Sequence, residues 1–96
     1  MKLLDRIEAN RADIVRIVAE NHGANPRVFG SVARGDDTQT SDVDILVDRM
    51  PGLTLFRLAA MQNEIEAILG VEVDVVTSGS VPEPAISEIL SEARSL

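Results

Sequence analysis

Two aspartates that stand one residue apart inside an apolar segment constrain the fold of this chain more than any other feature. Asp42 and Asp44 fall in the segment 41–48, which also carries two valines, an isoleucine and a leucine, and this composition predicts a β-strand. Aspartate is a poor strand former and its charge is costly to bury, so two together usually hold something cationic. Because side chains alternate along a strand, both aspartates are predicted to point to one face and the apolar residues to the core.

A glycine and a serine precede this strand by ten residues. Residues 27–29 are predicted to form a short strand that ends at Gly30 and Ser31, and a single helical turn follows. Glycine permits close backbone approach, and free amide groups with a serine hydroxyl are what a phosphate tail needs. Arg34 can add a positive charge to bound phosphates or pair with a neighbouring aspartate, and the sequence favours neither role over the other. Ser41 either shapes the turn before the second strand or contacts the ligand.

The other elements follow from hydrophobic periodicity. Apolar residues recur at helical spacing over about 3–21, over 54–69 and from Pro84 onward, which predicts three helices. Valine alternates with acidic residues over 71–77, which predicts a strand with Asp74 on the face opposite to its valines. The order helix, strand, strand, helix, strand, helix predicts an α+β fold in which a small three-stranded sheet is backed by helices.

The overall composition excludes several classes of function. The length predicts a single domain over residues 1–96. The 16 acidic and 9 basic residues give a formal net charge of -7, which repels phosphate backbones, and the two phenylalanines offer little for stacking on bases. Direct nucleic-acid binding is therefore not expected. The absence of cysteine excludes thiolate metal sites, and the absence of a long apolar run argues against a membrane span, so a cytoplasmic location is expected.

Three carboxylates can meet if the second and third strands are neighbours in the sheet. Asp42, Asp44 and Asp74 then share one face and repel one another, unless they are protonated or bridged by a divalent cation. Oxygen ligands without histidine or cysteine suit magnesium or manganese rather than zinc. Two such ions can activate an attacking oxygen and stabilise the leaving oxygen at a phosphorus, while the third carboxylate takes the proton of the attacking hydroxyl.

These motifs resemble a known superfamily. The Gly30-Ser31 pair, the aspartate pair ten residues later and Asp74 in a valine-rich strand resemble the polymerase-beta-like nucleotidyltransferases. Within it, the local sequences 29–35 and 41–45 are similar to those of the minimal nucleotidyltransferases, the MNT antitoxins. The resemblance runs from about Arg27 to Thr77.

The resemblance implies a mixed three-stranded sheet, two magnesium ions, with manganese as the alternative, and a nucleoside triphosphate, usually ATP, as donor. It implies that Asp42 and Asp44 hold the metals and that Asp74 joins one of them and acts as the base. It further implies that Gly30 and Ser31 hold the phosphates.

The resemblance also implies a protein partner. In the minimal family the partner is typically a HEPN-domain toxin, an RNase, and the antitoxin of this type VII-like pair moves AMP from Mg-ATP to a toxin tyrosine. The chain shows no acceptor domain, so a hetero-oligomer with the toxin is expected, and the acidic surface suits a protein partner better than RNA. Two alternatives stay open: a binding module that neutralises its partner without catalysis, and nucleotidyl transfer to a small molecule or an RNA end.

Overall fold

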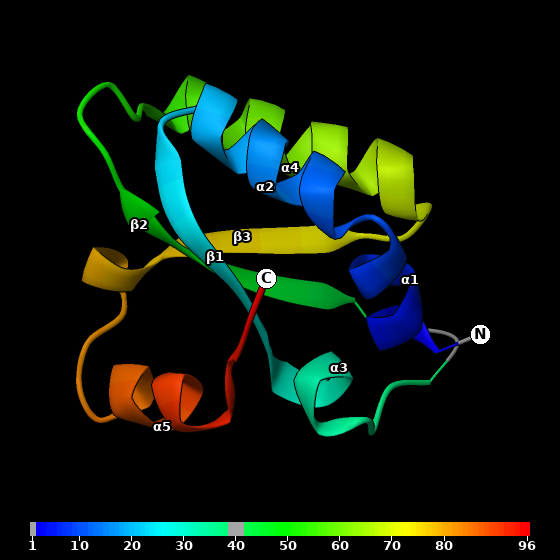
Figure 1. Cartoon of the computed structure of the whole chain (residues 1–96). Helices are drawn as coiled ribbons and strands as arrows, with labels where there is room; N and C mark the ends of the chain where they lie inside the picture. The colour runs from blue at the N-terminus through cyan, green and yellow to red at the C-terminus, as the bar shows by residue number, and fades with distance from the viewer. Residues whose placement is uncertain (1, 39–41) are drawn as a thin grey trace.

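The computed structural model describes residues 2–38 and 42–96, which form a four-stranded mixed sheet with helices on both faces (Figure 1). In Figure 1, α2 and α4 lie side by side over one face of the sheet, while α3 and α5 lie beneath the other. The elements in chain order are α1 (Leu3–Ala9), α2 (Arg11–Glu20), β1 (Gly23–Phe29), α3 (Gly30–Arg34), β2 (Val43–Arg49), α4 (Leu55–Leu69), β3 (Val73–Thr77), a 3-10 turn (Ser78–Ser80), α5 (Ala85–Glu92) and β4 (Arg94–Ser95).

Strand β2 lies in the interior of the sheet, whose order is β3-β2-β1-β4. It runs antiparallel to β1 and parallel to β3, and α4 makes the crossover that parallel neighbours require. The predicted α+β class and the three predicted strands are confirmed. The predicted number of strands was wrong, because the sheet has a fourth strand, β4, whose two residues pair antiparallel with β1. Two residues carry no measurable alternation, so no sequence pattern could reveal this strand.

The first helix also differs from its prediction. The single helix expected over 3–21 is two helices, α1 and α2, with Asn10 between them. The side-chain amide of Asn10 donates a hydrogen bond of 2.8 Å to the carbonyl oxygen of Arg6. Asparagine competes in this way for backbone hydrogen bonds, which makes it a natural place for a helix to end. The apolar residues on either side of the break, Ile7 and Ile14, keep helical spacing, so the periodicity did not reveal the change of direction.

The hydrophobic core fills the space between the sheet and the helices α2 and α4. As predicted, alternate residues of β2 face this core: Val43, Ile45 and Val47 are all 0% exposed. The face of β2 that carries Asp44 is therefore the one turned away from the core, toward α3 and α5. Among residues 2–38 and 42–96, no helix is long and apolar enough to cross a membrane.

The packing of α4 on the sheet can be tested by truncating a single side chain. Ile65 is 0% exposed within the core, so Ile65→Ala is expected to lower the free energy of unfolding by about 2 to 5 kcal/mol. Leu55 on the same helix belonged to the predicted apolar stripe but is 81% exposed, so Leu55→Ala is expected to change it by less than about 0.5 kcal/mol. Urea denaturation of both variants provides the measurement. Equal losses in the two variants would contradict this placement of α4.

Candidate active site

The acidic residues singled out in the sequence come from two neighbouring strands. Asp44 of β2 and Asp74 of β3 are direct partners in the parallel register, and Asp42 immediately precedes β2. Asp44 is partly buried, whereas Asp42 and Asp74 are exposed. Strand alternation places Asp44 and Asp74 on the face of the sheet opposite to the core, and Asp42 is near enough for its charge to act on Asp44. The expectation that the second and third predicted strands are neighbours is thus confirmed.

The surroundings of Asp44 shift the pKa of its carboxyl. Burial, followed by the negative charges of Asp74 and Asp42, raises the pKa of the Asp44 carboxyl above its usual value. The positive charge of Arg34 opposes this rise, and the carboxylate of Glu92 adds to it. The cluster therefore holds more negative charge than its own residues neutralise, and a cation would relieve that repulsion.

The carboxylates do not form a complete metal-binding site by themselves. Within the described parts of the chain, no three His, Cys, Asp or Glu side chains stand close enough together to hold a metal ion by themselves. Magnesium rarely needs such a cage, since it is usually held by one or two carboxylates together with substrate phosphates. The oxygen donors and the unrelieved repulsion at Asp44 fit a hard divalent cation of this kind.

Gly30 lies directly against Asp44. Its φ of 75° falls in the left-handed region, and a Cβ atom built on it would stand 2.5 Å from Oδ2 of Asp44. Any other residue at position 30 would therefore displace the carboxylate as well as strain the backbone. Ser31 follows in the first turn of α3 and is partly buried. The structure thus brings the predicted glycine beside one of the predicted aspartates.

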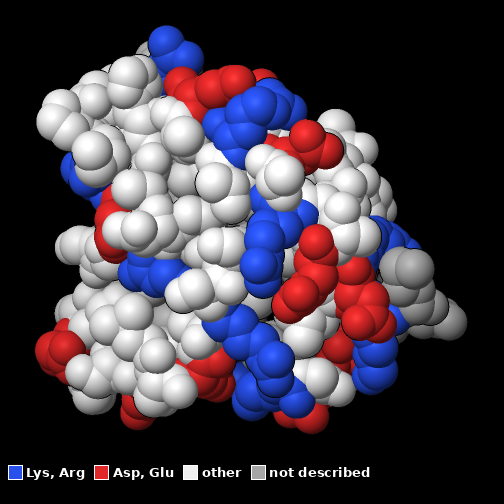
Figure 2. All heavy atoms as spheres, viewed as in Figure 1, with Lys and Arg blue, Asp and Glu red and all other residues white. Residues whose placement is uncertain are grey.

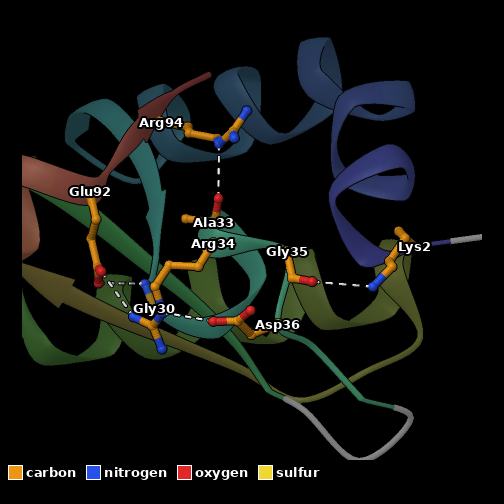
Figure 3. Close-up of polar contacts among 8 residues, drawn as sticks. All are labelled: Lys2, Gly30, Ala33, Arg34, Gly35, Asp36, Glu92 and Arg94. Atoms are coloured by element: carbon orange, nitrogen blue, oxygen red, sulfur yellow. Dashed lines mark hydrogen bonds and ion pairs between the residues drawn. The ribbon is translucent and has the colours of Figure 1, made fainter.

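Arg34 makes two ion pairs (Figure 3). Its Nε donates to Oδ2 of Asp36 at 3.2 Å, which is one of the two roles that the sequence left open. Its Nη1 donates to Oε2 of Glu92 at 2.9 Å, a contact that the sequence did not predict.

The remaining predicted site residue, Ser41, lies outside the described residues. On the face shown in Figure 2, acidic and basic side chains are intermixed toward the lower right, while the upper left is largely uncharged.

Glu92 is the one residue of this cluster that sequence reasoning missed. It ends α5, and its Oε1 accepts a hydrogen bond of 3.1 Å from the backbone N–H of Gly30. In the sequence Glu92 is one of several acidic residues on an amphipathic helix, 62 positions after Gly30. No local signal distinguishes it from its neighbours. Only the packing of α5 against α3 brings it to the site.

Comparison with sequences of known proteins gives a consistent result. A family profile described as nucleotidyltransferase domain matches residues 11–96. A Methanocaldococcus jannaschii protein named for protein adenylyltransferase activity is 31% identical over 93 residues, which cover 96% of this chain and 95% of that protein. The protein adenylyltransferase MntA of Thermococcus cleftensis is 38% identical over 65 residues, which cover 68% of this chain and 66% of MntA.

Solved structures show the same fold. A structure described as a minimal nucleotidyltransferase superposes with a TM-score of 0.89 at 35% identity, covering 97% of this chain and 95% of that one. A toxin-antitoxin complex with AMP-PNP contains a chain with a TM-score of 0.76 at 20% identity, covering 90% and 71% of the two chains. A complex of a tri-AMPylated Shewanella oneidensis HEPN toxin with its MNT antitoxin gives 0.69 at 18%, covering 92% and 69%. At these lower identities the likeness concerns the fold alone.

Proposed function

The chain belongs to the nucleotidyltransferase domain family, and from this premise we propose that it transfers AMP from ATP to a hydroxyl group of a partner protein. The observation that carries the proposal is the pairing of Asp44 with Asp74 across β2 and β3, with Gly30 packed against Asp44. This arrangement puts carboxylates and a closely approaching backbone N–H on the same side of the sheet. A triphosphate and its divalent cation need both kinds of group in one place.

Each residue has a defined part in the proposed reaction. The hydroxyl oxygen attacks the α-phosphorus of ATP, a new oxygen–phosphorus bond forms, and the bond to the β-phosphate oxygen breaks to release pyrophosphate. Asp74, whose side chain is exposed, accepts the proton of the hydroxyl. Asp42 and Asp44 would hold magnesium, which would supply positive charge to offset the negative charge of the phosphates. Gly30 and Ser31 orient the phosphates through the backbone and the hydroxyl, and Arg34 and Ser41 belong to the same nucleotide site.

The partner that we propose is a HEPN-domain toxin, with a tyrosine as the acceptor. The support comes from the related fold found beside a tri-AMPylated HEPN toxin and from the protein adenylyltransferases among the relatives. The net charge of -7 agrees with a protein acceptor better than with RNA. In this proposal the chain acts as the antitoxin, forms a hetero-oligomer with the toxin and neutralises it by modification.

Intact-protein mass spectrometry of a co-expressed HEPN partner tests the proposal. The partner is expected to gain one or more AMP groups with the wild-type chain and none with the Asp42→Asn/Asp44→Asn variant. A partner that stays unmodified beside the folded wild-type chain would overturn the proposed reaction. If the double variant leaves the partner unmodified and still neutralises it, then neutralisation proceeds by complex formation, and catalysis is not its cause.

A further inference from the structure

The carboxylate of Glu92 accepts hydrogen bonds from two groups that could otherwise bind phosphate in the proposed nucleotide site. One oxygen accepts from the backbone N–H of Gly30 at 3.1 Å, and the other accepts from Nη1 of Arg34 at 2.9 Å. Figure 3 shows this side chain reaching from the end of α5 to both donors. A carboxylate and a phosphate are both anions that offer two oxygens at similar spacing, so they compete for the same pair of donors.

The residues that directly follow α5 are held in place by contacts that do not involve Glu92. Nε of Arg94 donates to the carbonyl oxygen of Ala33 at 2.9 Å, as Figure 3 also shows. Strand β4 pairs with β1, and the backbone N–H of Leu96 donates to the carbonyl oxygen of Pro26 at 3.0 Å. The side chain of Glu92 is itself 29% exposed. It can therefore rotate away from its donors while α5 stays docked.

The charge of Glu92 affects the site as well as its contacts. The hydrogen bond from Arg34 and the one from Gly30 lower the pKa of the Glu92 carboxyl, despite partial desolvation that opposes them, so the group is ionised at neutral pH. The same negative charge adds to the repulsion felt by Asp44. In the absence of ligand, Glu92 thus both blocks the donors and repels any anion that approaches them.

We propose that Glu92 competes with the phosphates of the nucleotide for their binding site, as a carboxylate that a polyphosphate must displace from Gly30 and Arg34. A neutral ligand cannot replace the charge-assisted contacts of the carboxylate, whereas a polyphosphate chain brings several anionic oxygens and its own divalent cation. This inference rests on the proposed nucleotide site. It adds that the free protein keeps that site filled by its own side chain.

A purely structural role for Glu92 predicts a different result. If the side chain only ties α5 to α3, its removal loosens the site and leaves nucleotide affinity unchanged or weaker. If it competes with phosphate, its removal raises the fraction of protein that is ready to bind, and the apparent affinity rises in proportion. The direction of the change in affinity therefore separates the two roles.

Isothermal titration of the whole chain with AMP-PNP, and separately with inorganic tripolyphosphate, both with magnesium, tests the proposal. Glu92→Gln and Glu92→Ala are each expected to lower the dissociation constant of both ligands by about three- to tenfold, since a competing occupant is removed. Glu88→Gln is the matched control, because Glu88 is an exposed residue of the same helix and the substitution removes the same charge. It is expected to change either constant by less than about twofold. Thermal melting confirms that each variant is folded.

A double-mutant cycle locates the effect. In an Arg34→Gln background, Glu92→Gln is expected to lose most of its gain, because one of the two contested donors is gone. Unchanged or weaker binding in both Glu92 variants, an equal gain in Glu88→Gln, or no measurable binding in any variant would each overturn the proposal. Failure of the proposed reaction is distinguishable. A wild-type chain that binds AMP-PNP and shows the Glu92 effect, yet never modifies a HEPN partner, refutes AMP transfer and leaves the role of Glu92 intact.

Discussion

Asp44→Asn is expected to reduce AMP transfer by about a hundred- to a thousandfold and, in the same molecule, to raise the stability of the metal-free chain. The loss of activity follows from the place of Asp44 beside Gly30 and opposite Asp74, where an amide oxygen cannot supply the negative charge that a divalent cation and its phosphates require. The isosteric amide keeps the shape of the site. The loss is therefore electrostatic in origin.

The gain in stability follows from the raised pKa of Asp44. Burial, Asp74 and Asp42 make the folded protein bind a proton at this carboxyl more tightly than the unfolded chain does. Its contribution to stability is therefore greatest below the unfolded pKa and is lost as the pH rises through the folded pKa. At neutral pH the ionised carboxyl destabilises the fold, and the neutral amide removes this penalty. The chain keeps a destabilising charge where the proposed reaction needs one.

Urea denaturation without divalent cations, as a function of pH, measures this effect. We expect Asp44→Asn to unfold at higher urea than the wild type at pH 7 and the difference to shrink as the pH falls toward the usual aspartate range. Asp5→Asn is the control, because Asp5 is exposed in the first turn of α1, and its free energy of unfolding should change by less than about 0.5 kcal/mol. A less stable Asp44→Asn at pH 7 would contradict the repulsion described for this site.

Gly30→Ala is expected to destabilise the fold and to slow the reaction, whereas Gly35→Ala is expected to destabilise the fold alone. The two glycines have almost the same backbone conformation, with φ of 75° and 77°. A Cβ atom at Gly35 meets nothing within 4 Å, so its cost is the conformational strain of about 1 to 2 kcal/mol. At Gly30 the same strain is joined by a clash with Oδ2 of Asp44, the end of a side chain that can rotate, so the added loss of stability is about 1 kcal/mol and the main consequence is a displaced carboxylate.

The consequence for transfer should be larger than that for stability. A displacement of about 1 Å at a reacting group costs about a hundredfold in rate, and we expect a loss of this size in Gly30→Ala but not in Gly35→Ala. Thermal or urea unfolding together with AMP transfer to the partner provides the measurement. Adding Asp44→Ala to Gly30→Ala should remove the excess loss of stability over Gly35→Ala, because the clashing carboxylate is gone. Equal destabilisation by the two glycine substitutions would show that Gly30 does not press on Asp44.

Local patterns in the sequence predicted the features of the site that depend on strand geometry. The alternation of apolar and acidic residues in the two strands was enough to place Asp44 and Asp74 on one face, and the structure makes them direct partners in the sheet. The sequence singled out Gly30 for close approach to a phosphate, and the structure adds a reason that was not predicted, the left-handed φ of 75° and the contact with Asp44. The roles proposed for these residues in binding and catalysis remain predictions, and Ser41 lies outside the described residues.

Other features could not be predicted, because they depend on tertiary packing. Glu92 reaches Gly30 only through the docking of α5 on α3, a contact between segments 62 positions apart that leaves no trace in local periodicity. The break at Asn10 lies between Ile7 and Ile14, whose spacing fits one helix as well as two, and a side-chain hydrogen bond from Asn10 to Arg6 accompanies it. Strand β4 is two residues long and forms only by pairing with β1. In each case a single contact, rather than a repeated pattern, decides the structure.

The parallel pairing of β2 with β3 has a consequence for how the protein is made. Asp42 and Asp44 leave the ribosome well before Asp74, and α4 lies between them in the chain. Parallel strands need a crossover connection between them, and contacts between distant segments form slowly. A nascent chain that ends within α4 therefore carries two of the three carboxylates without their partner. The three carboxylates of the proposed site are therefore brought together only after synthesis has passed β3, and a shorter nascent chain lacks Asp74, the residue proposed as the base.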